Sequence, residues 1–160
     1  MRKILNYNEV EKALQDNGIK DYTNVTVSQD TSMKDALELI TSVGMIISTH
    51  SSQLNLLAFV NPGTIVIEIR PTESAKWFGH SVFSQGPDIL GVHYIANSKH
   101  KPIGCDMSKS NAKGCITADI LVNRTELASA IGQGLEKQQQ NCPIWKCNNT
   151  SAHFSKKDSL

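Results

Sequence analysis

Apolar runs alternate with amphipathic stretches along the first half of the chain, and their spacing predicts strands and helices in turn. Residues 2–6 and 25–29 have the composition of short strands, and the wholly apolar run MIIS at 45–48 is typical of a buried parallel strand. The sequence NPG at 61–63 predicts a turn, because proline fixes φ and glycine permits the corner, and a fourth strand follows at 64–69.

Three helices are predicted among these strands, at 9–17, 32–43 and 52–60. Asn8 can cap the first helix and Gly18 can end it. Ser32, with Asp35 three residues later, resembles the capping box of the second helix, which Gly44 closes. Apolar residues recur on one face of these two helices, namely Val10, Ala13 and Leu14 in the first and Ala36, Leu37 and Ile40 in the second.

Strands that alternate with helices imply βαβ units joined by right-handed crossovers. We therefore expect an α/β fold with a Rossmann-like, mostly parallel sheet flanked by helices. After Pro71 the pattern loosens, and a loop of about 20 residues carries the first two cysteines. Gly132 and Gly134 weaken the last predicted helix. The later predicted elements are a helix at 74–83, a strand at 92–97 and a helix at 125–139 that Thr125 caps.

The length of 160 residues fits one domain, which we expect at 1–140, followed by a disordered, cysteine-containing tail at 141–160. Acidic and basic residues are interspersed and the net charge is +1, so the broad basic face of a nucleic-acid-binding protein is not evident. No apolar run approaches the roughly 20 residues of a membrane helix, and the start lacks the hydrophobic core of a signal peptide. The chain as given is therefore expected to be soluble.

All four cysteines lie in the last third of the chain, at Cys105, Cys115, Cys142 and Cys147. This grouping hints at two disulfides, and free thiols are the alternative. Most structural zinc sites have pairs of ligands separated by two to four residues, and the spacings of these cysteines do not follow that pattern. Sequons of the form Asn-x-Ser/Thr, which agree with a secreted glycoprotein, begin at Asn24, Asn123, Asn148 and Asn149.

Polar residues follow the apolar run at 45–48, where the predicted strand ends and the next predicted helix begins. His50, Ser51 and Ser52 lie there, and in an open α/β sheet this is where ligands bind. A diphosphate could accept hydrogen bonds from the backbone amides of residues 51–53 and from the two serine hydroxyls. The alternative is that a serine only caps the helix and His50 lies in a turn.

The stretch IISTHSSQLNLLAFVNPGTIVIEIRP at 46–71 resembles a block of the family 61 glycosyltransferases, (I/V)I(G/S)-x-HGAGL-x-NLLF-x-PPG(T/S)-x-V-(I/V)E(I/L)-x-P. The family's opening, R-x-I-x-N, is matched by Arg2, Ile4 and Asn6. The resemblance covers roughly residues 2–97 and is most specific in its ordered matches. These are His50, Leu54, Asn55, Leu56, Leu57, Phe59, Pro62, Gly63, Glu68 and Pro71.

The chain departs from the family where HGAG is expected, because HSSQ stands at 50–53 and replaces both glycines. Serine keeps an N–H and adds a hydroxyl, whereas Gln53 brings a larger side chain toward the donor. Divergent specificity and lost activity are both compatible with this change.

The resemblance implies that a sugar is transferred from a nucleotide diphosphate donor, such as UDP-GlcNAc or UDP-xylose, to an acceptor hydroxyl with inversion. It implies one lobe of a GT-B-like enzyme that needs no metal or other cofactor. Arg2 would offset the diphosphate charge, or else is an exposed terminal arginine. His50 would donate to a phosphate or sugar oxygen. Asn55 would reach the same part of the donor as His50, or else it faces solvent. Glu68 would accept a ribose or sugar hydroxyl, or else it forms an ion pair that holds a loop.

The general base of an inverting transfer is expected on the opposite, acceptor-binding lobe, which we expect to lie outside this chain, so the catalytic residues are not assigned. The implied partners are a nucleotide sugar, a protein or glycan acceptor and that lobe, in the Golgi or endoplasmic reticulum. The alternative is an inactive Rossmann-like binding module. No GxSxG, GxGxxG or P-loop motif occurs. Because His80, His93, His100 and Cys105 lack metal-ligand spacing, we expect surface histidines and no metal site.

Overall fold

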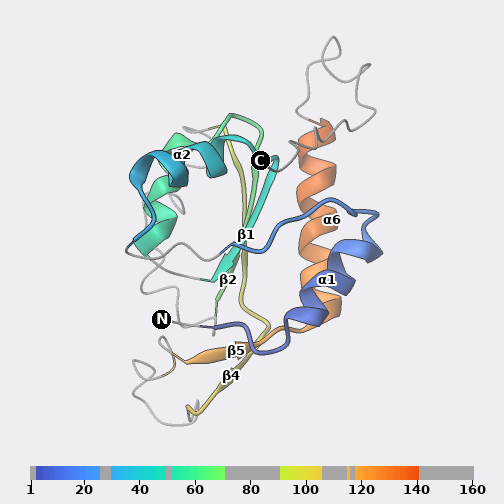
Figure 1. Ribbon diagram of the computed structural model, residues 1–160. Coiled ribbons are helices and arrows are strands. Elements are labelled where there is room, and N and C mark those ends of the chain that lie inside the picture. The colour runs from blue at the N-terminus through green and yellow to red at the C-terminus, as the bar shows by residue number, and fades with distance from the viewer. Residues whose placement is uncertain are drawn as a thin grey trace.

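Three parallel strands form the central sheet of the protein, in the order β1-β2-β3 (Figure 1). They are β1 (Met45–Thr49), β2 (Ile65–Ile69) and β3 (His93–Asn97). The computed structural model describes residues 3–25, 30–49, 52–70, 91–105, 115 and 118–140, without the side chains of residues 52, 53 and 55.

Strand β2 lies at the centre of the sheet, and all five of its residues are buried. Its Ile67 is opposite Ile47 of β1 and Ile95 of β3. Strand β1 is only partly buried along its whole length, so the expectation of a fully buried strand at 45–48 is wrong. The reason is that, among the described strands, β1 has a neighbour on one side only.

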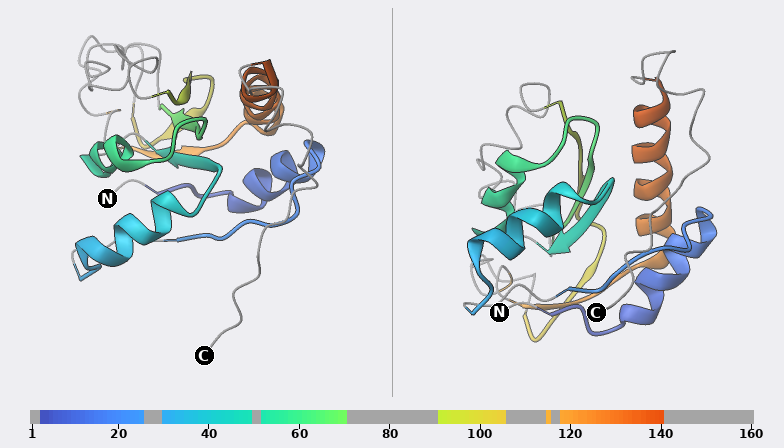
Figure 2. Two further views of the ribbon diagram at one scale, coloured as in Figure 1. Left: turned by 90° about the horizontal axis from the view of Figure 1, so that it is seen from above. Right: turned by 45° about the horizontal axis from the view of Figure 1, so that its top comes forward.

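Helices cover both faces of the sheet, because successive residues of β2 point to opposite sides. Ile65, Ile67 and Ile69 belong to the core cluster that includes α1 and α6, whereas Val66 belongs to the cluster that includes α2 and η1. The helices are α1 (Tyr7–Asp16), α2 (Met33–Thr41), the 3-10 helix η1 (Ser52–Phe59) and α6 (Arg124–Gln140). Figures 1 and 2 show the resulting three layers. The expected Rossmann-like α/β fold is confirmed.

Helix α6 packs directly on the sheet through one buried face. Leu127, Ala130 and Ile131 are buried. A Cβ added to Gly134 would lie 2.5 Å from Cγ2 of Ile65, which is closer than real Cβ contacts come. Gly134 is therefore the contact that lets the helix approach the sheet.

The cap of α6 is Asn123, and the prediction of Thr125 is wrong. The backbone carbonyl of Asn123 accepts from Leu127 N–H at 3.0 Å, and its side-chain Oδ1 accepts from Glu126 N–H at 3.4 Å. Thr125 lies within the first helical turn. Because serine, threonine and asparagine all make good caps, the sequence Asn-Arg-Thr leaves two choices that local propensity does not separate.

Helix α1 begins at Tyr7, before the predicted Asn8 cap, which therefore lies inside the helix. The preceding Asn6 uses its side chain elsewhere, donating to Val122 O at 2.9 Å and accepting from Val122 N–H at 2.7 Å. The predicted end is confirmed. Gly18 has φ +74°, its N–H donates to Gln15 O, and Ile19 N–H donates to Leu14 O, which is the Schellman pattern.

Ser32 caps the start of helix α2 and is hydrogen-bonded to Asp35, the two residues predicted for this cap. Ser32 Oγ accepts from Asp35 N–H at 3.1 Å and donates to Asp35 Oδ2 at 2.7 Å. Ala36 and Ile40 are buried, as the apolar stripe predicts. The helix ends at Thr41 with Ser42 as its C-cap, so Gly44 lies beyond the end that it was predicted to form.

The predicted helix at 52–60 is present, but it is the 3-10 helix η1. Its buried apolar residues Leu54 and Leu57 and the following Val60 are three positions apart, the spacing at which 3-10 side chains stack. A turn at 61–63 then leads into β2, as predicted. Thr64 N–H donates to Asn61 O at 3.1 Å across Gly63, whose φ is +87°.

The first predicted strand, at 2–6, does not join the parallel sheet. Ile4 forms an isolated parallel bridge with Ile120 instead. Ile120 lies in β5 (Asp119–Leu121), which pairs antiparallel with β4 (Lys101–Ile103) in a separate two-stranded sheet. Pairing with this later hairpin is a long-range event that a local apolar pattern does not encode.

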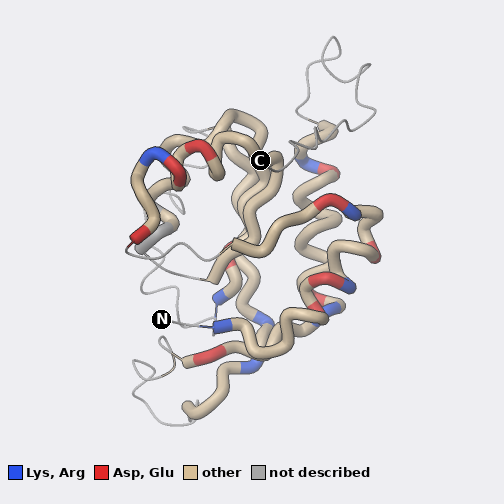
Figure 3. Tube along the Cα trace, viewed as in Figure 1, with Lys and Arg blue, Asp and Glu red and all other residues tan. Residues whose placement is uncertain are grey.

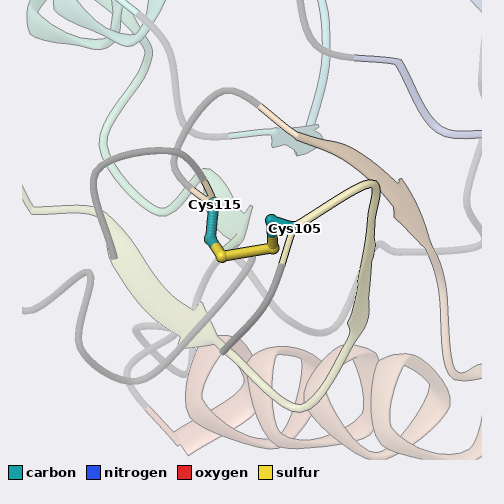
Figure 4. Close-up of a disulfide and its surroundings, with 2 residues drawn as sticks. All are labelled: Cys105 and Cys115. Carbon is teal, nitrogen blue, oxygen red and sulfur yellow. A yellow bond between two sulfur atoms is a disulfide. The ribbon is translucent and has the colours of Figure 1, made fainter. Parts of the chain in front are cut away.

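A disulfide joins Cys105 to Cys115 (Figure 4), with a Cα–Cα distance of 5.2 Å, and it ties the end of the β4 segment to the segment before β5. One of the two disulfides suggested by the cysteine grouping is therefore present. Cys142 and Cys147 lie outside the described residues, together with the predicted helix at 74–83 and the predicted tail; the predicted strand at 25–29 also lies there apart from Val25, which is in irregular structure.

Charged residues of both signs are interspersed along the described trace (Figure 3). Examples are the pairs Lys12–Glu9 at 2.7 Å and Arg124–Asp16 at 2.6 Å. None of the helices in the described residues has the length and apolar character needed to cross a membrane.

Candidate functional site

The carboxyl edge of the sheet, which we define by the last residues of β1, β2 and β3, is where open α/β sheets bind ligands. These residues are Thr49, Ile69 and Asn97. Because β1 ends at Thr49 and η1 begins at Ser52, the residues between them connect the two elements at this edge. The fold thus brings the start of η1, with backbone N–H groups that precede the first helical hydrogen bonds, to the predicted position.

The structure describes the predicted donor-binding residues to different extents. Arg2, His50 and Ser51 lie outside the described residues. The backbones of Ser52, Gln53 and Asn55 belong to η1, whereas their side chains are not described. The roles assigned to these six residues therefore stay predictions.

Glu68 is described in full, and it lies at the centre of a buried polar cluster that we call the Glu68 network (Glu68, Arg70 and Tyr94). Its exposed fraction is 0%. Arg70 donates to Glu68 Oε2 from Nε at 2.9 Å, and its second nitrogen lies 2.8 Å from the same oxygen. The Tyr94 hydroxyl also donates to Glu68 Oε2 and accepts from Arg70 at 2.7 Å.

The strand geometry explains why these three side chains meet. Glu68 and Arg70 are two residues apart in extended backbone, so they share a face with Val66, the face that η1 and α2 cover. Tyr94 of β3 is opposite Val66 in the register and packs against the same cluster. The network therefore lies under η1, near the carboxyl end of β2.

Burial and mutual charge set the titration of this network. Burial lowers the pKa of the Arg70 guanidinium, but the nearby Glu68 and Tyr94 oxygens outweigh burial and raise the pKa above its ordinary value. Burial, followed by the hydrogen bond to Glu68, raises the pKa of Tyr94. Arg70 thus stays charged and Tyr94 stays protonated at neutral pH, which favours an ionised Glu68 as their common acceptor. The ion pair that was one of the two interpretations of Glu68 is present, and its sugar-binding role stays a prediction.

The carboxyl end of β3 is tied to the first turn of α6. Asn97 Nδ2 donates to Glu126 O at 2.9 Å, and Asn97 O accepts from Arg70 N–H at 2.7 Å. Lys99 lies 3.3 Å from the Glu126 carboxylate. These bonds connect the ends of β2 and β3 to the start of α6 and fix one side of the carboxyl edge.

His100 is buried, with an exposed fraction of 7%, so the expectation of a surface histidine is wrong here. Its Nδ1 accepts from Asn123 N–H at 3.1 Å, and its Nε2 has no hydrogen-bond partner among the described residues. Burial lowers the pKa of His100 to about 4, against an opposing effect of Glu126. The ring is therefore neutral at pH 7 and acts as an acceptor at the start of α6.

Sequence reasoning missed Arg70 and Tyr94. A signal for Arg70 was present, since an acid and a base two positions apart in a predicted strand share one face and can pair. Tyr94 had no such signal, because its partner lies 26 residues earlier and the strand register decides the contact. The described residues contain no group of three or more histidine, cysteine, aspartate or glutamate side chains that could hold a metal ion.

The parallel sheet, its layers of helices and the polar segment after β1 define an α/β protein of the Rossmann-like class. Residues 1–67 match the family model described as Glycosyltransferase 61, so this part of the chain is similar to that family. The match includes Arg2, His50 and Asn55 and ends one residue before Glu68. A search of curated proteins finds no match.

Proposed function

We propose that the chain binds the donor of a glycosyltransferase, a nucleoside diphosphate sugar such as UDP-GlcNAc or UDP-xylose. The sugar passes to a hydroxyl of a protein or glycan acceptor, with inversion at the anomeric carbon. The observation that carries this proposal is the connection from β1 to η1 at the carboxyl edge of a parallel sheet, within the segment that matches family 61. The match supports the reaction class, and the edge supports the place of the diphosphate.

Each donor contact has a physical role in this proposal. The backbone amides of residues 51–53 and the hydroxyls of Ser51 and Ser52 donate to the diphosphate, and Arg2 offsets the negative charge that grows on the leaving group. His50 donates to a phosphate or sugar oxygen, and Asn55 lies on the next turn. Because arginine and amide donors stabilise the leaving group, the reaction needs no metal ion.

The Glu68 network places a buried pair of opposite charges, with no net charge, beside the carboxyl edge. Glu68 carries a negative charge that would repel a diphosphate, and the ion pair with Arg70 cancels it at 2.8 Å. In the proposed enzyme the chain is one lobe of a GT-B-like architecture, and the general base comes from the acceptor-binding lobe. The Cys105–Cys115 disulfide supports an oxidising compartment, the lumen of the secretory pathway, as the place of the reaction.

Calorimetric titration of the folded chain with UDP and UDP-sugars tests the proposal. We expect saturable binding that EDTA does not change, and Arg2→Ala should weaken it roughly tenfold or more, since a charged hydrogen bond contributes about 1.5–3 kcal/mol. The matched control is Lys12→Ala, which removes an exposed cation paired with Glu9 on α1 and should leave binding unchanged.

A titration without saturable heat for UDP or any UDP-sugar would contradict the proposal. That result would favour the inactive Rossmann-like binding module, because the HSSQ sequence at 50–53 replaces the two glycines at which the family's backbone approaches its ligand.

A further inference from the structure

The start of α6 carries an Asn-x-Thr sequon whose three residues are all described and exposed. They are Asn123, Arg124 and Thr125, and the middle residue is not proline. This sequence is the acceptor for N-linked oligosaccharides in the secretory lumen. The structure adds what the sequence does not contain, namely which atoms of Asn123 are in use.

The cap of α6 engages every polar atom of Asn123 except its side-chain nitrogen. The backbone N–H donates to His100 Nδ1 at 3.1 Å, the backbone O accepts from Leu127 N–H at 3.0 Å, and Oδ1 accepts from Glu126 N–H at 3.4 Å. Within the described part of the chain, Nδ2 donates to no acceptor. The atom that glycosylation modifies is thus the one that the fold does not need.

We propose that Asn123 Nδ2 carries an N-linked oligosaccharide. In the transfer, a bond forms between Nδ2 and C1 of the first sugar, and the bond from C1 to the diphosphate of a lipid-linked oligosaccharide breaks. The diphosphate leaves with the electron pair, and Nδ2 gives up one proton. The product is still an amide whose Oδ1 keeps its lone pairs, so the cap of α6 survives the modification.

Two further observations support this site. The Cys105–Cys115 disulfide belongs to the same oxidising lumen in which the oligosaccharide donor is found. The side chain of Asn123 is exposed, and α6, which follows it, lies on the opposite face of the sheet from η1 (Figure 1). The inference rests on the secretory location given with the proposed function, but it does not depend on donor binding.

The experiment expresses the full chain behind an endoplasmic-reticulum signal peptide in cultured human cells and maps occupied sequons by mass spectrometry of glycopeptides. Thr125→Ala removes the sequon and keeps the Asn123 cap, Thr125→Ser keeps both, and Asn123→Asp keeps a capping oxygen without Nδ2. We expect a glycan on Asn123 in the parent chain and in Thr125→Ser. Its signal should fall to background in the other two variants, with melting temperatures near that of the parent chain after enzymatic deglycosylation.

An unmodified Asn123 in parent chain whose signal peptide has been cleaved overturns the inference, whether or not other sequons of the same molecules carry glycans. Asn24, Asn148 and Asn149 are mapped in the same samples for this purpose. Donor binding is measured separately on unglycosylated chain, so that a failure here is distinguishable from a failure of the proposed function.

Discussion

Glu68 and Arg70 bring an ion pair into a strand that is otherwise apolar, and both side chains are almost fully buried, with exposed fractions of 1% and 8%. Burying two charges costs several kcal/mol for each ion, and close pairing with good hydrogen bonds is needed to offset that cost. The Tyr94 hydroxyl adds such a bond. At the scale of single residues, this network is a buried and hydrogen-bonded ion pair near the carboxyl end of β2.

Removing the Glu68 charge should be far more harmful than removing an exposed one. We predict that Glu68→Gln lowers the free energy of unfolding by about 3–5 kcal/mol, because Arg70 is left buried without its counter-charge. The matched control, Glu38→Gln, breaks an exposed pair with Lys34 at 3.8 Å and should change the free energy of unfolding by less than about 1 kcal/mol. Urea unfolding curves give both values, and equal effects would refute the role of burial.

His100 should make the stability of the fold depend on pH. Because burial lowers its pKa from 6.5 to about 4, the unfolded chain binds more protons between these values. The contribution of neutral His100 is complete above pH 6.5 and is lost as the pH falls toward 4, by at most about 3 kcal/mol. Nearby Glu126, itself paired with Lys99, opposes this effect.

The variant His100→Asn isolates that contribution, since its side-chain oxygen can replace Nδ1 as the acceptor for Asn123 N–H. We predict that urea unfolding between pH 4 and 6.5 shows a smaller loss of stability in this variant than in the parent chain. Identical pH dependence in the two chains would assign the effect to other groups.

At the scale of single residues, the sequence predicted the polar character of the site but not its contacts. His50, Ser51 and Ser52 were placed at the end of a strand by periodicity alone. The burial of His100 could not be predicted, because it depends on the hairpin and on the start of α6, which are distant in the sequence. Contacts of this kind are fixed by strand register and loop closure, and neither can be predicted from a local sequence pattern.

At the scale of elements, local patterns predicted the existence of helices and strands well and their ends less well. The Ser32 cap of α2 and the glycine end of α1 were correct because each is a short-range hydrogen-bond pattern. The predicted cap of α6 was wrong because Asn123 and Thr125 have similar propensities to cap a helix. The partly buried β1 was misjudged, since burial of a strand depends on its neighbours in the sheet.

Gly134 shows how packing overrides helix propensity. Gly134→Ala gains up to about 1 kcal/mol of helix propensity, but the new Cβ would lie 2.5 Å from Ile65. We predict a net loss of about 1–2 kcal/mol in the free energy of unfolding, since overpacking costs about 1–3 kcal/mol. The matched control is Gly132→Ala in the same helix, where the nearest atom is Asn17 Oδ1 at 3.3 Å.

This control should change the free energy of unfolding by less than about 1 kcal/mol, because the strain on Asn17 and the gain in helix propensity oppose each other. Thermal unfolding of the two variants provides the comparison. A Gly134→Ala chain as stable as the Gly132→Ala chain would show that the close approach of α6 to the sheet is not needed.

At the scale of the whole molecule, alternating strands and helices were enough to predict a parallel α/β fold, because βαβ units have few stable arrangements. The separate pair of strands β4 and β5 and the bridge from Ile4 to Ile120 were not predicted, since both strands are short and the bridge joins residues far apart in the sequence. The layered core places the end of β1 and the start of η1 at the carboxyl edge of the sheet. The proposed donor site depends on this placement.

Mapping of the backbone amide resonances by NMR during titration with UDP tests that placement most directly. We predict that the largest shifts fall on residues 51–53 and on their neighbours at the carboxyl ends of β1 and β2. Largest shifts at the opposite edge, around Met45, Ile65 and His93, or no saturable shifts at all, would contradict it.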